Sequence, residues 1–312
     1  MTLMTPTRIA SILFVLAATL PVYACGGATA DTETTAEGAD GEQYAIRIHR
    51  PFVDGQLLAI EVDAHQIIEA TIEGNEEEVA GITEELRCHL EAQVTFHETT
   101  EDGRAAHATL LINNFSDPED GTAIIEAGTS IDVSRDGDDM VLSVEDGALT
   151  EDQAALLLLA IPLERPGSRL GDELFGTDEP QAVNDSWQLN REYLVQDLAD
   201  DGLHVTETNV TGETRLESVS ACGDGQCLHL VANISAAQGI MAELADAAEF
   251  EEGQINAIVR LEVPVDDSSP VVSEEATVTG QFTARFESEE VTVVRNLSFS
   301  RMRHARYTLI TE

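Results

Sequence analysis

Lysine is absent from this sequence of 312 residues, so all 16 basic residues are arginines, and they stand against 59 acidic residues. The resulting net charge of −43 excludes nucleic acid as a partner, because phosphate binding requires a basic face. A charge of this size also makes the compact chain repel itself. In molar salt the screening length shrinks to about 3 Å, and most of that repulsion disappears.

The acidic residues are spread along the whole chain rather than gathered in one block. In this respect the sequence resembles the proteins of halophilic bacteria, and we expect a protein adapted to high salt. Binding of calcium or of a cationic partner is the alternative. Asp132-x-Ser134-x-Asp136 begins like a calcium-binding loop, but the acid required at its twelfth position is replaced by Ser143. We therefore predict a hairpin turn at Asp132–Asp138.

Catalytic motifs are missing as well. The sequence contains no nucleophile elbow, metalloprotease helix, phosphate loop or dinucleotide fingerprint. Acidic residues are so frequent that no single pair of carboxylates is informative. We expect no catalytic residues, no resident metal and no cofactor, and an enzyme is the least favoured of the function classes.

Long apolar runs are confined to the N-terminus. Residues 9–20 form an apolar stretch that follows Arg8 and ends before Pro21. This is the layout of a secretory signal, and the stretch is too short to span a bilayer well. Further along the chain, the longest apolar run is Ala154–Ile161. Residues 1–24 are therefore predicted to be a signal peptide.

A cysteine stands at the predicted cut, in Val22-Tyr23-Ala24-Cys25-Gly26. The segment resembles the lipobox of bacterial lipoproteins. The resemblance implies that Cys25 becomes the first residue and carries several acyl chains, palmitate among them, which together hold a protein stably on a membrane. In that family an Asp after the cysteine retains the protein in the inner membrane, so Gly26 points to the outer membrane. A plain cleaved signal is the alternative.

The predicted fold is mainly β (α+β), with two lobes of curved antiparallel sheet, each packed on a helix. Alternating apolar residues predict a hairpin from Leu86–Phe96 and Ala106–Ile112, and further strands at 58–64, 257–265 and 276–286. Helices are predicted at Ala154–Ile161, behind a capping box of Thr150 and Gln153, and at Ala236–Phe250.

Five segments follow from this pattern: the signal peptide at 1–24, the lipidated Cys25 with an acidic tether over 25–43, an N-terminal β-rich lobe at 44–165, a linker at 166–181 and a C-terminal β-rich lobe at 182–312. The tether contains no large apolar residue and cannot bury enough surface to fold.

The second lobe begins with Val183-Asn184-Asp185-Ser186-Trp187. This string is similar to a turn motif of uncharacterised, two-lobed secreted bacterial proteins, which place Gly-Asp-Ser/Thr-Trp at the start of a second β-lobe. Asn184 replaces the glycine here. The resemblance implies the two-lobed architecture and brings no activity with it.

Cysteine is scarce, with three residues besides Cys25. Export implies an oxidising compartment, so Cys222 and Cys227, which enclose a four-residue loop between two strand-like stretches, are predicted to form a disulfide. Cys88 lies on the apolar side of its strand and is predicted to be a buried free thiol.

Two sets of polar residues remain as candidate ligand-binding sites. His89, His97 and His107 lie on the polar face of the first hairpin, where a metal site is possible but a solvated face is favoured. The one basic region contains Arg301, Arg303 and Arg306. These charges either lie on an edge strand and discourage its pairing, or they contact lipid phosphates or another anionic envelope component.

The sequence therefore predicts an exported, lipid-anchored protein of the cell envelope, bound to the membrane through its anchor. The favoured function is a non-catalytic binding module for a hydrophobic or amphipathic envelope ligand such as a lipid. The alternative is a structural or interaction lipoprotein of the outer envelope that has no small-molecule ligand.

Overall fold

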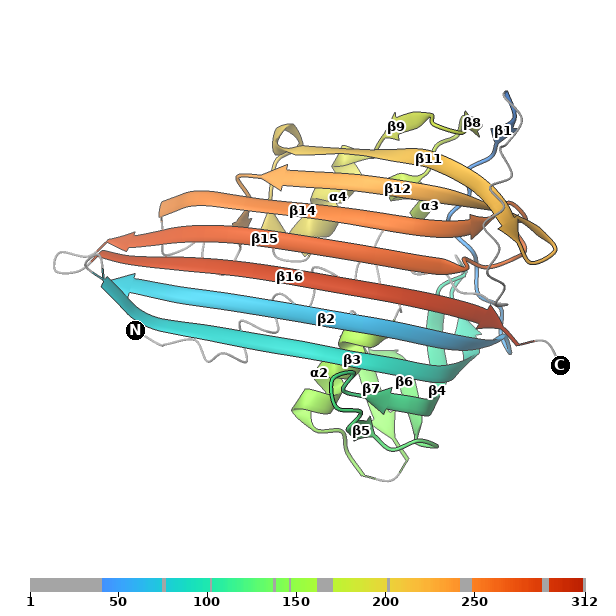
Figure 1. The fold of residues 1–312 in the computed structure, drawn as a ribbon, viewed down its shortest axis with the longest axis horizontal. Coiled ribbons are helices and arrows are strands. Elements are labelled where there is room, and N and C mark those ends of the chain that lie inside the picture. The colour runs from blue at the N-terminus through green and yellow to red at the C-terminus, as the bar shows by residue number, and fades with distance from the viewer. Residues whose placement is uncertain are drawn as a thin grey trace.

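The computed structural model describes residues 41–74, 77–101, 103–136, 139–145, 147–161, 171–200, 203–241, 249–287 and 292–310. Within these ranges the chain is mainly β, and most strands belong to one antiparallel sheet (Figure 1). The strand order across this sheet is β7-β6-β4-β3-β2-β16-β15-β14-β12-β11-β9, and β5 pairs with β4.

The strands of the large sheet are β2 (Leu57–Gly74), β3 (Glu77–Thr99), β4 (Ala105–Ser116), β5 (Ala123–Ile125), β6 (Ser130–Asp136), β7 (Asp139–Val144), β9 (Ser186–Gln188), β11 (Val210–Cys222), β12 (Gly225–Ala237), β14 (Glu249–Pro264), β15 (Ser273–Glu287) and β16 (Thr292–Leu309). Two short ladders lie outside it: β1 (Gln43–Tyr44) with β8 (Gln181–Ala182), and β10 (Leu203–His204) with β13 (Ile240–Met241).

The large sheet has one face packed by helices, which we call the covered face, and one that we call the open face. Along β2, residues at even positions from Leu58 to Ile68 are buried, while odd positions carry groups such as Glu61 and Asp63. Helix α2 (Glu151–Ala160) packs on β2 and β3, whereas α3 (Gly171–Phe175) and α4 (Arg191–Asp200) pack on the C-terminal half. The mainly-β fold and its alternation are thus confirmed.

The two expected lobes correspond to two apolar clusters on one continuous sheet. β16, the last strand of the chain, pairs with β2 from Leu58↔Leu309 to Val293↔Gly74 (Figure 1). The N-terminal and C-terminal halves therefore share a backbone ladder. The segment expected to link them, 166–181, includes α3, whose Leu174 and Phe175 are buried.

One predicted helix is confirmed and one is wrong. α2 begins at the predicted capping box, with Thr150 Oγ1 accepting from the Gln153 amide and the Gln153 side chain accepting from the Thr150 amide. The helix expected over Ala236–Phe250 is replaced at both ends by strand, because Ala236 pairs with Ile255 and Phe250 with Ala284 in the sheet. Its centre, 242–248, lies outside the described residues.

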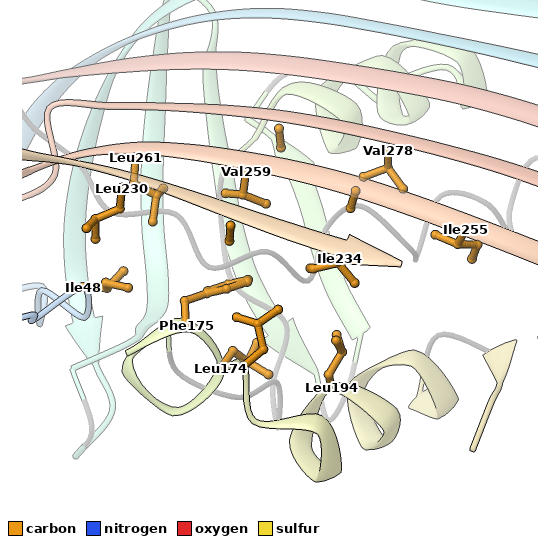
Figure 2. Close-up of a cluster of buried hydrophobic side chains, with 14 of the residues drawn as sticks. Ile48, Leu174, Phe175, Leu194, Leu230, Ile234, Ile255, Val259, Leu261 and Val278 are labelled. Carbon is orange, nitrogen blue, oxygen red and sulfur yellow. The ribbon is translucent and has the colours of Figure 1, made fainter. Parts of the chain in front are cut away.

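The segment that follows the predicted tether crosses to the C-terminal half. Tyr44, Ile46 and Ile48 are buried in the cluster that also holds Phe175 of α3. Figure 2 shows Ile48 close to Phe175. The Ile48 amide donates to the Asp172 carboxylate at 2.5 Å. Residues 44–48 therefore support the second half of the sheet, although they precede the first.

The turn at Asn184 explains the similarity to a glycine-containing motif. Asn184 has φ of 75°, a left-handed conformation that glycine adopts most easily and asparagine tolerates. Its side chain accepts from Arg215, and the Trp187 indole donates to the Phe175 carbonyl at 2.8 Å. The motif thus anchors β9 to α3.

Candidate binding surfaces

The covered face carries two apolar clusters with a polar strip between them. On β16, Tyr307 and Ala305 belong to the cluster under α2, while Phe299 belongs to the cluster under α3 and α4. Figure 2 shows part of the latter, with the strand residues Leu230, Ile234, Ile255, Val259, Leu261 and Val278 facing Leu174, Phe175 and Leu194 of the helices.

The polar strip between the clusters is formed by Gln66, Glu274, Arg301 and Arg303, which are 1–3% exposed. All four lie on the covered face, since Ala64 pairs with Arg303 and Gln66 with Arg301. Arg303 contacts the Glu274 carboxylate at 2.9 Å, and Arg301 donates to the carbonyl of Leu159 in α2 at 3.3 Å. We refer to these four residues as the buried polar strip.

Burial governs the ionisation of this strip. It lowers the pKa of Arg301 to about 9, with Arg303 acting in the same direction. It raises the pKa of Glu274, against the opposing effect of Arg303. Among the described residues, the nitrogen of the Gln66 amide and one oxygen of Glu274 have no hydrogen-bond partner. The strip therefore places charge where desolvation is costly.

These positions correct the sequence interpretation of the basic region. β16 is a central strand, so its arginines do not protect a sheet edge. Arg301 and Arg303 face inward on the same side of β16 as Tyr307, and their contacts are the Leu159 carbonyl and the Glu274 carboxylate. Of the three predicted anion contacts, Arg306 alone is well exposed, and it lies 3.7 Å from Glu61. Gln66 and Glu274 were missed, although a polar residue at an inward position of an alternating strand is a visible signal.

Toward the Gly74 end of β2, the covered face carries a partly exposed apolar area. Ala70, Ile72 and Leu297 are half-buried there, and Ile82 is 44% exposed. Pairing brings them together across β3, β2 and β16, since Ala70 lies opposite both Ile82 and Leu297. We call these four residues the apolar end patch. The half-buried Glu84 borders it on β3.

The open face carries the histidines predicted to lie on the polar side of the first hairpin. His97 and His107 face each other with ring centroids 4.9 Å apart, next to a β-bulge between Phe96 and Glu98. His107 contacts Asp132 at 2.6 Å, and His97 contacts Thr109 at 2.7 Å. These contacts occupy one ring nitrogen of each histidine.

His89 lies further along the same face. Partial burial disfavours its charged form, but hydrogen bonds with Asp63 and Glu91 outweigh that effect and raise its pKa. Among the described residues, the histidines belong to no cluster of three potential metal ligands within reach of one ion.

The cysteine predictions are confirmed. Cys222 and Cys227 form a disulfide at the turn between β11 and β12. Their sulfurs lie near Glu262, but the disulfide occupies them and removes them as metal ligands. Cys88 is a buried free thiol. Burial raises its pKa to about 12, so it is not a reactive thiolate.

Comparisons with known proteins leave the function open. No protein-family model matches the chain, and no curated protein matches it either. Among solved structures, one described as "Lipid-protein interactions in lipovitellin" resembles 84% of this chain at 10% sequence identity, with a TM-score of 0.31. The similarity spans about a quarter of that protein's length (26%).

The predicted signal peptide, Cys25 and most of the tether lie outside the described residues. Within the described part of the chain, no helix combines the length and apolarity needed to cross a membrane.

Proposed function

We propose that this chain is an exported, lipid-anchored envelope protein of a salt-adapted bacterium that binds the apolar part of an amphipathic ligand. The observation that carries the proposal is the apolar end patch, where aliphatic side chains of the covered face stay partly exposed. Cys25 supplies the anchor in the outer membrane, and the acidic surface keeps the domain soluble in salt.

The composition of the apolar end patch supports a hydrocarbon ligand. Its described side chains are aliphatic, and Ile82 is among the most exposed large apolar residues of the chain. Covering an aliphatic side chain fully is worth about 1.5–3 kcal/mol. An acyl chain laid across Ala70, Ile82 and Leu297 would remove this surface from water, while a polar head group would remain in solvent.

The anchor is tested separately from the ligand. Cells of a halophilic bacterium expressing the full chain are fed an alkyne-labelled fatty acid, and the protein is recovered from membrane and soluble fractions. We expect label and membrane retention for the wild type and neither for Cys25→Ala. Retention of label in Cys25→Ala would contradict the anchor.

The ligand is tested by extracting lipid from the purified Cys25→Ala protein, which carries no acyl chain of its own. We expect a co-purifying, organic-soluble molecule that is lost in the Ile82→Glu variant. Val265→Glu is the matched control, because Val265 is equally exposed at 43% and lies outside the patch. Absence of lipid from the parent protein would overturn the ligand proposal and favour the structural or interaction role.

A further inference from the structure

A hollow on the open face is chemically different from the rest of the surface. It has a volume of about 420 Å³ and crosses the four central strands β2, β16, β15 and β14. Its lining consists mainly of short or uncharged polar residues, namely Gln254, Asn256, Thr279, Gly280, Gln281, Ser298 and Ser300, together with Ile67, Glu69 and Phe299. We call this hollow the central trough.

The side chains of the central trough stand in two rows that run across the strands. One row is Asn256-Thr279-Ser300-Ile67, and the other is Gln254-Gln281-Ser298-Glu69, each in direct cross-strand register. Strand spacing of about 4.8 Å makes each row roughly 14 Å long, and the rows lie roughly 7 Å apart. The trough is thus a short channel with parallel hydrogen-bonding walls.

Charge is nearly excluded from these rows. The chain has 59 acidic residues, yet the lining of the trough includes Glu69 as its one carboxylate and no arginine. Thr279, Gln281 and Ser300 are exposed, so a ligand in the trough can reach their hydroxyl and amide groups. Ser298 contacts Glu69 at 3.3 Å. An ordinary solvated face of this protein would carry carboxylates here.

An aliphatic ledge borders the first row. Ile258 on β14 and Met302 on β16 are 36% and 46% exposed, and Thr277 on β15 stands between them in register. Ile258 and Met302 therefore offer a ligand an apolar contact next to the amide and hydroxyl groups of the first row. Neutral sugars combine hydroxyl groups with apolar C–H surfaces and suit such a pairing.

We propose that the central trough binds a neutral saccharide chain. Amide and hydroxyl groups both donate and accept, which matches the sugar hydroxyls. An anionic polymer would be repelled by the net charge of −43, and a cationic partner would find more carboxylates elsewhere. The volume lies within the usual range of ligand sites, roughly 300–1,000 Å³. This site is on the opposite face from the apolar end patch and does not depend on the lipid proposal.

Binding is measured by isothermal titration calorimetry with the purified Cys25→Ala protein in molar NaCl and in a sugar-free detergent. The probes are cellotetraose, maltotetraose, N-acetylchitotetraose and the acidic tetragalacturonate. We expect at least one neutral tetrasaccharide to bind and tetragalacturonate not to bind. Failure of all three neutral probes, or preference for the acidic one, would overturn the proposal.

The site is assigned with Thr279→Trp, which fills the trough from an exposed strand position. Thr211→Trp is the matched control, because Thr211 is also an exposed threonine on the open face, on β11. We expect affinity to fall at least tenfold in Thr279→Trp and to stay unchanged in Thr211→Trp. Asn256→Ala with Gln281→Ala removes donors without adding bulk and should also weaken binding. Equal losses in Thr279→Trp and Thr211→Trp would place the ligand elsewhere.

Discussion

Arg303 and Glu274 form an ion pair at 2.9 Å with almost no access to water on either side. Removing one member of such a pair leaves a buried charge uncompensated, which costs about 3–5 kcal/mol. We predict this loss for Arg303→Met, measured by urea unfolding in molar NaCl. The loss should grow as the pH rises, because burial raises the pKa of Glu274 and the lone carboxyl is tolerated when protonated.

The double variant Arg303→Met with Glu274→Leu is the control for this prediction. It removes both charges and keeps the volume, so it should recover most of the lost stability. A single variant as stable as the wild type at neutral pH would show that the pair is not buried as described.

At the residue scale, the sequence predicted which side chains share a face but not what covers them. The odd-numbered spacing of Arg301, Arg303 and Tyr307 is enough to put them on one side of a strand. Their burial depends on distant parts of the chain, such as the carbonyl of Leu159 that accepts from Arg301 across 142 residues. Alternation along one strand carries no information about such contacts.

The hairpin of β11 and β12 is stabilised both by its ladder and by the Cys222–Cys227 disulfide. Cross-linking a loop this short removes about 2 kcal/mol of chain entropy from the unfolded state. We predict that Cys222→Ser with Cys227→Ser loses about this amount in urea unfolding. The variant should keep its far-UV circular dichroism, because the ladder from Val210↔Ala236 to Cys222↔Gly225 is continuous apart from one bulge.

Reduction of the wild type with dithiothreitol provides the comparison for the serine variant. Both should unfold at the same urea concentration, since Cys88 is buried and takes no part. A larger loss on reduction than in the double variant would contradict the assignment of the pair.

At the element scale, strands were predictable because their signal is local. The alternation from Leu86 to Phe96 predicts a strand without knowledge of its pairing partner. The start of α2 was predicted from its own capping box. The segment around Ile240 and Met241 carries a helical spacing, but the adjacent sheet ladder extends to Ala237 and resumes at Glu249. Long-range pairing therefore overrides local preference there. α3 is too short to give a periodic signal.

At the scale of the whole molecule, the sequence predicted two lobes and the structure joins them through β16. Pairing of β16 with β2 links segments more than 200 residues apart, and nothing in either strand identifies its partner. Both strands alternate in the same way as their neighbours. The polar strip then lies where the two halves meet, since β2 and β16 contribute three of its four residues.

The net charge of −43 leads to a prediction for the whole molecule. Lowering NaCl from molar to about 0.1 M lengthens the screening distance from about 3 Å to about 10 Å, so carboxylates across the sheet begin to repel each other. We predict a lower melting temperature at low salt. The melting temperature of the wild type is measured by circular dichroism across a NaCl series. A melting temperature that stays constant or rises as salt is removed would contradict the prediction.

A variant on the open face distinguishes repulsion between carboxylates from a general effect of salt on the burial of apolar side chains. Glu61 and Glu91 stand directly opposite each other on β2 and β3, and their side chains are 45% and 51% exposed. Facing like charges destabilise a sheet by roughly 0.2–1 kcal/mol. Glu91→Gln should therefore raise the melting temperature at low salt and leave it unchanged in molar NaCl, where the repulsion is screened. If Glu91→Gln gave the same change at both salt concentrations, salt would act through apolar burial, and the acidic surface would not be the cause of the salt requirement.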